Sequence, residues 1–109
     1  MDITTESVMA GLSCGEVSLI AWPIIAAGVS DFLAITDDRI GPLMRRLAHE
    51  ESIVGGESAV AGLAGLIEAR KDERLRGRLG LTTQSRVLLF GTEGATDPEV
   101  YRSMVDEAD

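Results

Sequence analysis

Several residue types that usually guide a search for function are scarce in this chain of 109 residues. Cys14 is the only cysteine, which excludes an intrachain disulfide and makes a reducing, cytoplasmic compartment the default. His49 is the only histidine, and no cysteine lies at metal-ligand spacing from it, so we expect no transition-metal site. Lys71 is the only lysine. It lies in a charged stretch, so we expect it at the surface rather than in the desolvated pocket that a reactive amine needs.

Positive charge, aromatic residues and long hydrophobic runs are scarce as well. Ten basic residues stand against 18 acidic ones, and the resulting net charge of −8 argues against nucleic acid or an anionic membrane as the main partner. Aromatic residues make up 4% of the chain and hydrophobic residues 45%, so the core must be aliphatic. The longest apolar segment, Val17 to Val29, is too short to span a bilayer, and we interpret it as a buried helix. No basic segment followed by an apolar run opens the chain, so we expect no signal peptide.

The stretch from Arg86 to Glu99 is the most informative part of the sequence. Val87 to Phe90 form a short apolar run that predicts a strand buried on both faces. Gly91 to Gly94 form a polar turn after it, and Asp97 and Pro98 are typical of a helix start. A strand, a glycine turn and a helix start form the place where open α/β sheets bind ligands. The same residues are equally compatible with a turn that only needs two glycines.

The rest of the chain alternates predicted helices with one further apolar run. Phe32 to Ile35 predict a second buried strand, and Ser7 to Leu12 a short strand or an extended lead into a turn. The predicted helices cover residues 18–28, 37–49, 57–70, 73–79 and 98–106. The sequence therefore predicts an α/β fold, with a few parallel strands flanked by helices, in a single segment of residues 1–109.

One property does not fit a self-sufficient domain. Several predicted helices are apolar all round, and two strands cannot cover that much apolar surface. We therefore expect the missing cover to come from another chain or from sequence that this chain does not contain.

Gly55 to Ser58 form a second glycine turn, at a predicted helix start. Free amides there favour an anion, whereas Glu57 opposes one. A tight turn capped by Ser58 or Glu57 is the interpretation that spacing alone favours.

Three motifs resemble, in the same order, the C-terminal part of the diaminopropionate ammonia-lyase family: Ser7 to Glu16, Gly56 to Leu63 and Leu88 to Asp97. That family shares the fold type II of pyridoxal-phosphate enzymes with threonine dehydratase and the tryptophan synthase β chain. The resemblance implies an α,β-elimination of 2,3-diaminopropionate or a related amino acid to pyruvate and ammonia. It also implies pyridoxal phosphate as the cofactor and a homodimer as the assembly.

The resemblance assigns no catalytic residue to this chain but implies five that contact the cofactor. In such enzymes a Ser or Thr at the end of a late strand faces the pyridine nitrogen. The matching position is Gly91, which has no side chain, so the role passes to Thr92, and Gly94 closes the same turn. Glu57 matches a glutamate close to the cofactor face, and Gly11 matches a segment near the floor of the active site.

The family's cofactor lysine and its glycine-rich phosphate cradle have no counterpart in this sequence. We therefore expect a C-terminal portion of such a lyase, inactive without the remainder of the enzyme. The alternative hypothesis is a non-catalytic small α/β module that binds a ligand at its glycine turns or serves for oligomerisation.

Overall fold

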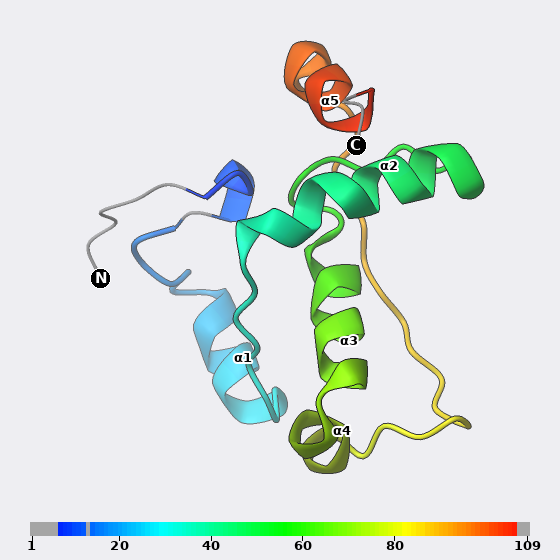
Figure 1. Ribbon diagram of the computed structural model, residues 1–109. Helices are drawn as coiled ribbons and strands as arrows, with labels where there is room; N and C mark the ends of the chain where they lie inside the picture. The colour runs from blue at the N-terminus through cyan, green and yellow to red at the C-terminus, as the bar shows by residue number, and fades with distance from the viewer. Residues whose placement is uncertain (1–6, 13, 107–109) are drawn as a thin grey trace.

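Five α-helices and two short 3₁₀ helices make up the regular structure of residues 7–12 and 14–106, the part of the chain that this computed structural model describes (Figure 1). In chain order they are η1 (Ala10–Leu12), α1 (Ala21–Gly28), η2 (Asp37–Arg39), α2 (Ile40–Glu50), α3 (Ala61–Lys71), α4 (Glu73–Leu79) and α5 (Pro98–Val105). The longest of these, α2 and α3, have 11 residues each. Among the described residues, no helix combines the length and the apolar character needed to cross a membrane.

The core lies around α2, where three elements meet. Ile40 and Met44 are almost completely buried, and Leu43 is buried beside them. They pack with Met9 from the N-terminal segment and with three residues contributed by α5, α3 and the turn before α3: Val105, Ala64 and Val60. The buried residues of α2 thus follow i, i+3, i+4 spacing, which places them on one face of the helix.

The C-terminal helix α5 is fixed to α2 by polar contacts as well. The guanidinium of Arg45 donates to the carbonyl oxygen of Met104 at 2.9 Å, and the His49 ring lies 3.3 Å from the carbonyl oxygen of Val105. Arg45 is half-buried because it reaches this helix end.

The helix ends follow the sequence signals. Asp97 accepts hydrogen bonds from the amides of Glu99 and Val100, and Pro98 occupies the first turn of α5. Asp72 caps α4 in the same way, and Gly80 ends it in the left-handed conformation, with φ of 68°.

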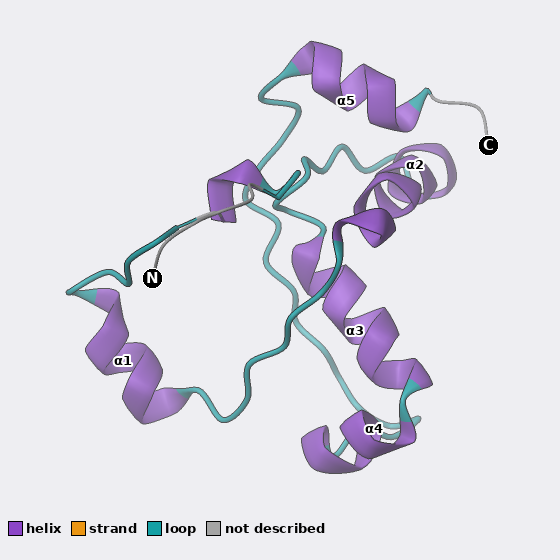
Figure 2. Cartoon of the chain, turned by 60° about the vertical axis from the view of Figure 1, so that its left-hand side comes forward, coloured by secondary structure: helices purple, strands orange, loops and turns teal. Residues whose placement is uncertain are grey.

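The predicted strands are wrong for this structure, because no strand is present among the described residues (Figure 2). Val87 to Phe90 and Phe32 to Ile35 run as extended segments, and no backbone hydrogen bond joins them to each other or to other described residues. The expected burial on both faces is wrong too, since Phe32 is 71% exposed and Phe90 78% exposed. A ladder needs a neighbour, and neither segment has one here.

Both extended segments nevertheless lie against α3. A Cβ built on Gly62 would come 3.3 Å from Leu89, and one built on Gly65 would come 4.0 Å from Leu33. The small residues of α3 thus permit the close approach that their size predicts.

The helix α1 also differs from its prediction. It begins at Ala21, later than Ser18, as Pro23 allows. It is not enclosed: Ile24 is 72% exposed, and Leu19 and Ile20, just before it, are 91% and 84% exposed. Figure 2 shows α1 apart from the other helices.

Candidate functional site

The two glycine turns that the sequence singles out meet in space. The backbone N–H of Gly56 donates to the carbonyl oxygen of Glu93 at 2.9 Å. The N–H of Ser58 donates to the carboxylate of the same residue at 3.0 Å, across 35 positions of sequence. Glu93 therefore holds the turn at residues 91–94 against the turn at residues 55–58 with both its backbone and its side chain.

Gly56 is the position of these turns where only glycine fits. A Cβ there would overlap the Glu93 carboxylate and the carbonyl oxygen of Gly94, and would lie 2.8 Å from Cγ of Glu93. By contrast, a Cβ on Gly91 would make ordinary contacts with Ala59, and one on Gly94 would meet nothing within 4 Å.

The third matched segment reaches the same place. Gly11 lies in η1, and a Cβ on it would come 3.1 Å from Oγ of Ser58 and 3.7 Å from Glu93. That hydroxyl oxygen is buried and has no hydrogen-bond partner among the described residues. Three segments that are distant in sequence therefore converge on Glu93 and Ser58.

The predicted site residues divide into two groups. Gly11, Gly91 and Gly94 have no side chains and contribute only backbone to the converging segments. Thr92 and Glu57 lie in the same turns and carry side chains. Thr92 is exposed, Glu57 is half-buried, and neither side chain forms a hydrogen bond with another described residue. An exposed hydroxyl at Thr92 is free to contact a ligand.

Sequence reasoning missed Glu93 as the organising residue. The sequence offered one signal for it: Glu93 is a carboxylate in a turn of small residues, and a carboxylate can pair with the free amides at a predicted helix start. Since Glu93 already binds the Ser58 amide, an external anion at Gly55–Ser58 has to compete with a carboxylate of the chain itself.

Lys71 lies at the other end of α3 from this site. It is the last residue of the helix and is exposed, whereas Gly56 and Ser58 precede the first turn. Eleven helical residues separate the two ends by about 15 Å. The surface position predicted for this lysine is therefore confirmed.

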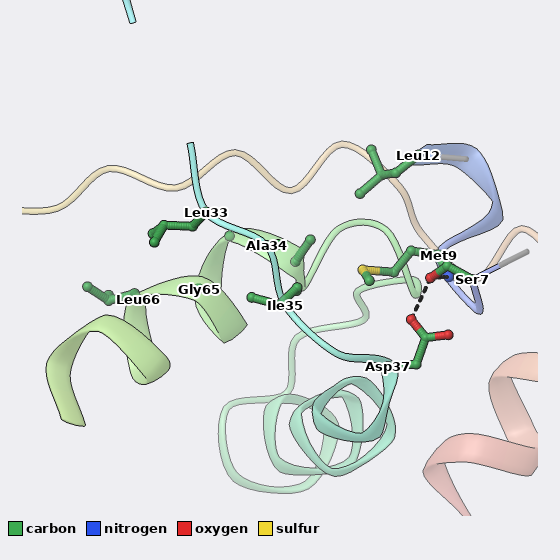
Figure 3. A pocket seen from close by; sticks show the side chains of 11 residues that line it. Ser7, Met9, Leu12, Leu33, Ala34, Ile35, Asp37, Gly65 and Leu66 are labelled. Carbon is green, nitrogen blue, oxygen red and sulfur yellow. Dashed lines mark hydrogen bonds between the residues drawn. The ribbon is translucent and has the colours of Figure 1, made fainter. Parts of the chain in front are cut away.

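A cavity of about 520 Å³ lies beside the site, between the N-terminal segment, residues 33–35 and α3 (Figure 3). Its lining is mainly apolar, with Met9, Leu33 and Leu66 among the side chains, and none of the predicted site residues contributes to it. Ser7 and Asp37 supply its polar edge.

Asp37 closes this edge by two hydrogen bonds. The Ser7 hydroxyl donates to its carboxylate at 2.5 Å, and the Val8 amide donates at 2.9 Å. These two bonds, the hydroxyl first, lower the pKa of Asp37 from its ordinary value of 3.8.

The described residues contain no cluster of three or more His, Cys, Asp or Glu side chains that could hold a metal ion. The single histidine lies against the C-terminal end of α5, and the single cysteine is exposed in the loop before α1.

Comparison with known proteins identifies the relatives of this chain. Residues 2–91 match the family described as "Pyridoxal-phosphate dependent enzyme". The diaminopropionate ammonia-lyase of Salmonella typhimurium is 36% identical over 107 residues, which is 91% of this chain and 26% of that protein. The diaminopropionate ammonia-lyase of Escherichia coli K12 is 32% identical over 108 residues, 93% of this chain and 27% of that protein. The chain thus spans about a quarter of the length of these curated relatives, and no solved structure matches it.

Proposed function

Because this chain belongs to the pyridoxal-phosphate-dependent enzyme family, we propose that it is the C-terminal portion of an ammonia-lyase of that family. The observation that carries the proposal is the convergence of three matched segments at one place. Gly11, Gly56 and Glu93 come from separate motifs: Gly56 and Ser58 bind Glu93 through their amides, and Gly11 lies against Ser58 and Glu93.

The residues present fit one side of the cofactor. Thr92 offers an exposed hydroxyl, and Gly91 and Gly94 keep the chain open beside it, as the ring side of a pocket requires. Glu57 and Gly11 would complete this wall. When bound, pyridoxal phosphate supplies the electron sink for an elimination.

The same residues do not fit the covalent and phosphate ends of the cofactor. The only amine side chain lies about 15 Å away along α3. The amides of Gly56 and Ser58 are already bonded to Glu93, whose negative charge opposes a phosphate. The chain by itself therefore provides a wall of the pocket and no base for proton abstraction.

The proposed reaction of the whole enzyme is the elimination of 2,3-diaminopropionate, or a related amino acid, to pyruvate and ammonia. We propose that it takes place in a cytoplasmic homodimer, in which this chain also supplies part of the subunit packing. The partner of the chain is either a second copy or the portion of the enzyme that corresponds to the remaining three quarters of the relatives.

A titration with pyridoxal phosphate, followed by borohydride reduction and mass spectrometry, tests the proposal. We expect weak, non-covalent binding and no adduct on Lys71. Thr92→Val should weaken the binding, since it removes the hydroxyl of this turn and keeps the shape. The matched control is Thr96→Val, an exposed threonine beyond Gly94.

Two results would contradict the assignment. A borohydride-stable adduct on Lys71 would show that the chain has its own reactive amine. Equal loss of binding in the Thr92 and Thr96 variants would show that the cofactor does not bind specifically at the turn of residues 91–94.

A further inference from the structure

A second cavity, of about 500 Å³, opens at the opposite end of α3 from the glycine turns. The last turns of α3, the helix α4 and residues 81–87 enclose it. Figure 1 shows how the chain leaves α4 and returns along α3, so that these three parts face one another. A volume of this size suits a small organic molecule.

The polar lining of this cavity is entirely cationic or hydroxylic. No carboxylate of the described residues lines it. The polar lining consists of two arginines and three hydroxyl residues: Arg70, Arg76, Thr82, Thr83 and Ser85. The chain as a whole carries a net charge of −8, so a lining free of acidic groups is a local exception.

The two guanidinium groups differ in what holds them. Arg76 donates from Nη1 to the carbonyl oxygen of Arg70 at 2.7 Å, which fixes its position and offsets the negative end of the α3 dipole. The side chain of Arg70 has no hydrogen-bond or ion-pair partner among the described residues. A guanidinium has five N–H donors, so both groups keep donors for a ligand.

The hydroxyl groups are arranged to donate. The Ser85 oxygen accepts from the amide of Thr82 at 2.8 Å, and the Thr82 oxygen accepts from the amide of Gln84 at 3.1 Å. Since each oxygen already accepts one bond in this turn, its O–H remains available to a ligand. The side chain of Thr83 makes no hydrogen bond in the described part of the chain.

The remaining lining is apolar. It consists of Leu66, Leu81 and Val87, so the cavity combines a cationic, hydroxylic part with an apolar part. Two positive charges match a group that carries between one and two negative charges at neutral pH, and guanidinium forks match the geometry of a phosphate.

We propose that this cavity binds a phosphomonoester with an apolar body. The site is separate from the proposed cofactor wall, because α3 lies between them, and it uses none of the residues assigned to that wall.

Calorimetric titration of the purified chain with phenyl phosphate tests the proposal, with inorganic phosphate and benzoate as separate probes. We expect saturable binding of phenyl phosphate in the millimolar range or tighter, with inorganic phosphate weaker because it lacks the apolar body. Arg76→Ala should weaken the affinity about tenfold, and Arg76→Lys less, because the ammonium keeps the charge and loses the fork.

The matched control is Arg74→Ala, which removes the same charge from α4 at a position outside the cavity. It should change the affinity less than twofold, since a remote exposed charge is screened by salt. Thr83→Val provides a second test that does not depend on the arginine variants, in case these fail to fold. This substitution at an exposed position removes one donor, and we expect a loss of about threefold.

Equal effects of Arg74→Ala and Arg76→Ala would overturn the proposal, because binding would then follow net charge alone. Absence of saturable binding would overturn it too. Benzoate binding as tightly as phenyl phosphate would also overturn it, because the cavity would then not distinguish a phosphate from a carboxylate. Thr92→Val separates this result from the proposed cofactor site, because it should leave the titration with phenyl phosphate unchanged.

Discussion

Glu93 and Gly56 show how single residues define the candidate site. One carboxylate and one carbonyl oxygen from Glu93 satisfy two amides of a turn 35 to 37 positions upstream. That arrangement leaves no room for a side chain at position 56. The sequence revealed both glycine turns, but the pairing depends on a long-range contact that no local pattern contains.

Gly56→Ala should destabilise the chain by about 2 kcal/mol, because the added methyl group overlaps the Glu93 side chain and the Gly94 backbone. Gly94→Ala, in the facing turn, should stay within about 0.5 kcal/mol of the wild type because its surroundings are open. Urea unfolding of the two variants measures both effects. Equal unfolding midpoints would show that the two turns do not pack as described.

Asp37 should make the stability depend on pH in the acid range. Its pKa is lowered by the Ser7 hydroxyl and the Val8 amide, so the folded chain binds the proton less readily than the unfolded one. The contribution is therefore complete above the unfolded pKa, near 3.8, and is lost as the pH falls through the lower folded pKa.

Measurement of the unfolding free energy of the wild type and of Asp37→Asn from about pH 2 to about pH 7 checks this prediction, since that range brackets the ordinary carboxylate pKa. The difference in unfolding free energy should be constant above about pH 5 and shrink below about pH 4. A difference that grows on acidification would reverse the sign and contradict the hydrogen-bond assignment.

At the scale of elements, the short helix α4 shows how much local chemistry decides. Asp72 caps its first turn, and Gly80 ends it with φ of 68°, where the amide of Leu81 reaches back to the carbonyl oxygen of Arg76 at 2.9 Å. A Cβ added to Gly77, in the middle of the same helix, would meet nothing within 4 Å outside the helix backbone. The two glycines therefore have different structural roles.

Substitution of these two glycines should shift stability in opposite directions. Gly77→Ala should stabilise the chain by about 1 kcal/mol, because alanine loses less backbone entropy in a helix. Gly80→Ala should destabilise it by about 1 kcal/mol, because an L side chain is strained in the left-handed region. Thermal unfolding distinguishes them, and a shift of the same sign in both would refute the described end of α4.

Helices were predictable from this sequence and strands were not, for a physical reason. The caps at Asp72 and Asp97 and the apolar spacing of α2 act within a few residues of one chain, so they appear in the sequence and in the structure alike. The apolar runs at residues 32–35 and 87–90 need a neighbouring strand to become a ladder. No described residue supplies one, so the runs stay extended and exposed.

At the scale of the whole molecule, the chain is more open than its length implies. The radius of gyration is 15.2 Å, against about 13 Å for a well-packed domain of this length. The accessible surface is 8415 Å², against about 5,800 Å² for a monomer of this mass. The expected shortage of cover for the apolar helices agrees with both values, and the excess area is on the scale of an obligate interface.

We therefore expect the chain to self-associate in sedimentation velocity at micromolar concentrations. Leu88 and Phe90 are 77% and 78% exposed, so Phe90→Ser should shift the equilibrium towards the monomer by about tenfold, the effect of withdrawing one aromatic side chain. The control is Val100→Ser, which alters a less exposed apolar residue on α5. A wild-type chain that stays monomeric at all concentrations would contradict the association.

The exposed position of α1 also has an optical consequence. Trp22, the only tryptophan of the chain, lies on this helix, and nearly half of its surface is open to water. Indole emission moves to shorter wavelengths when water leaves the ring. Fluorescence of the unlabelled chain therefore reports directly when another polypeptide covers α1, and it does so without interference from the core, which contains no indole.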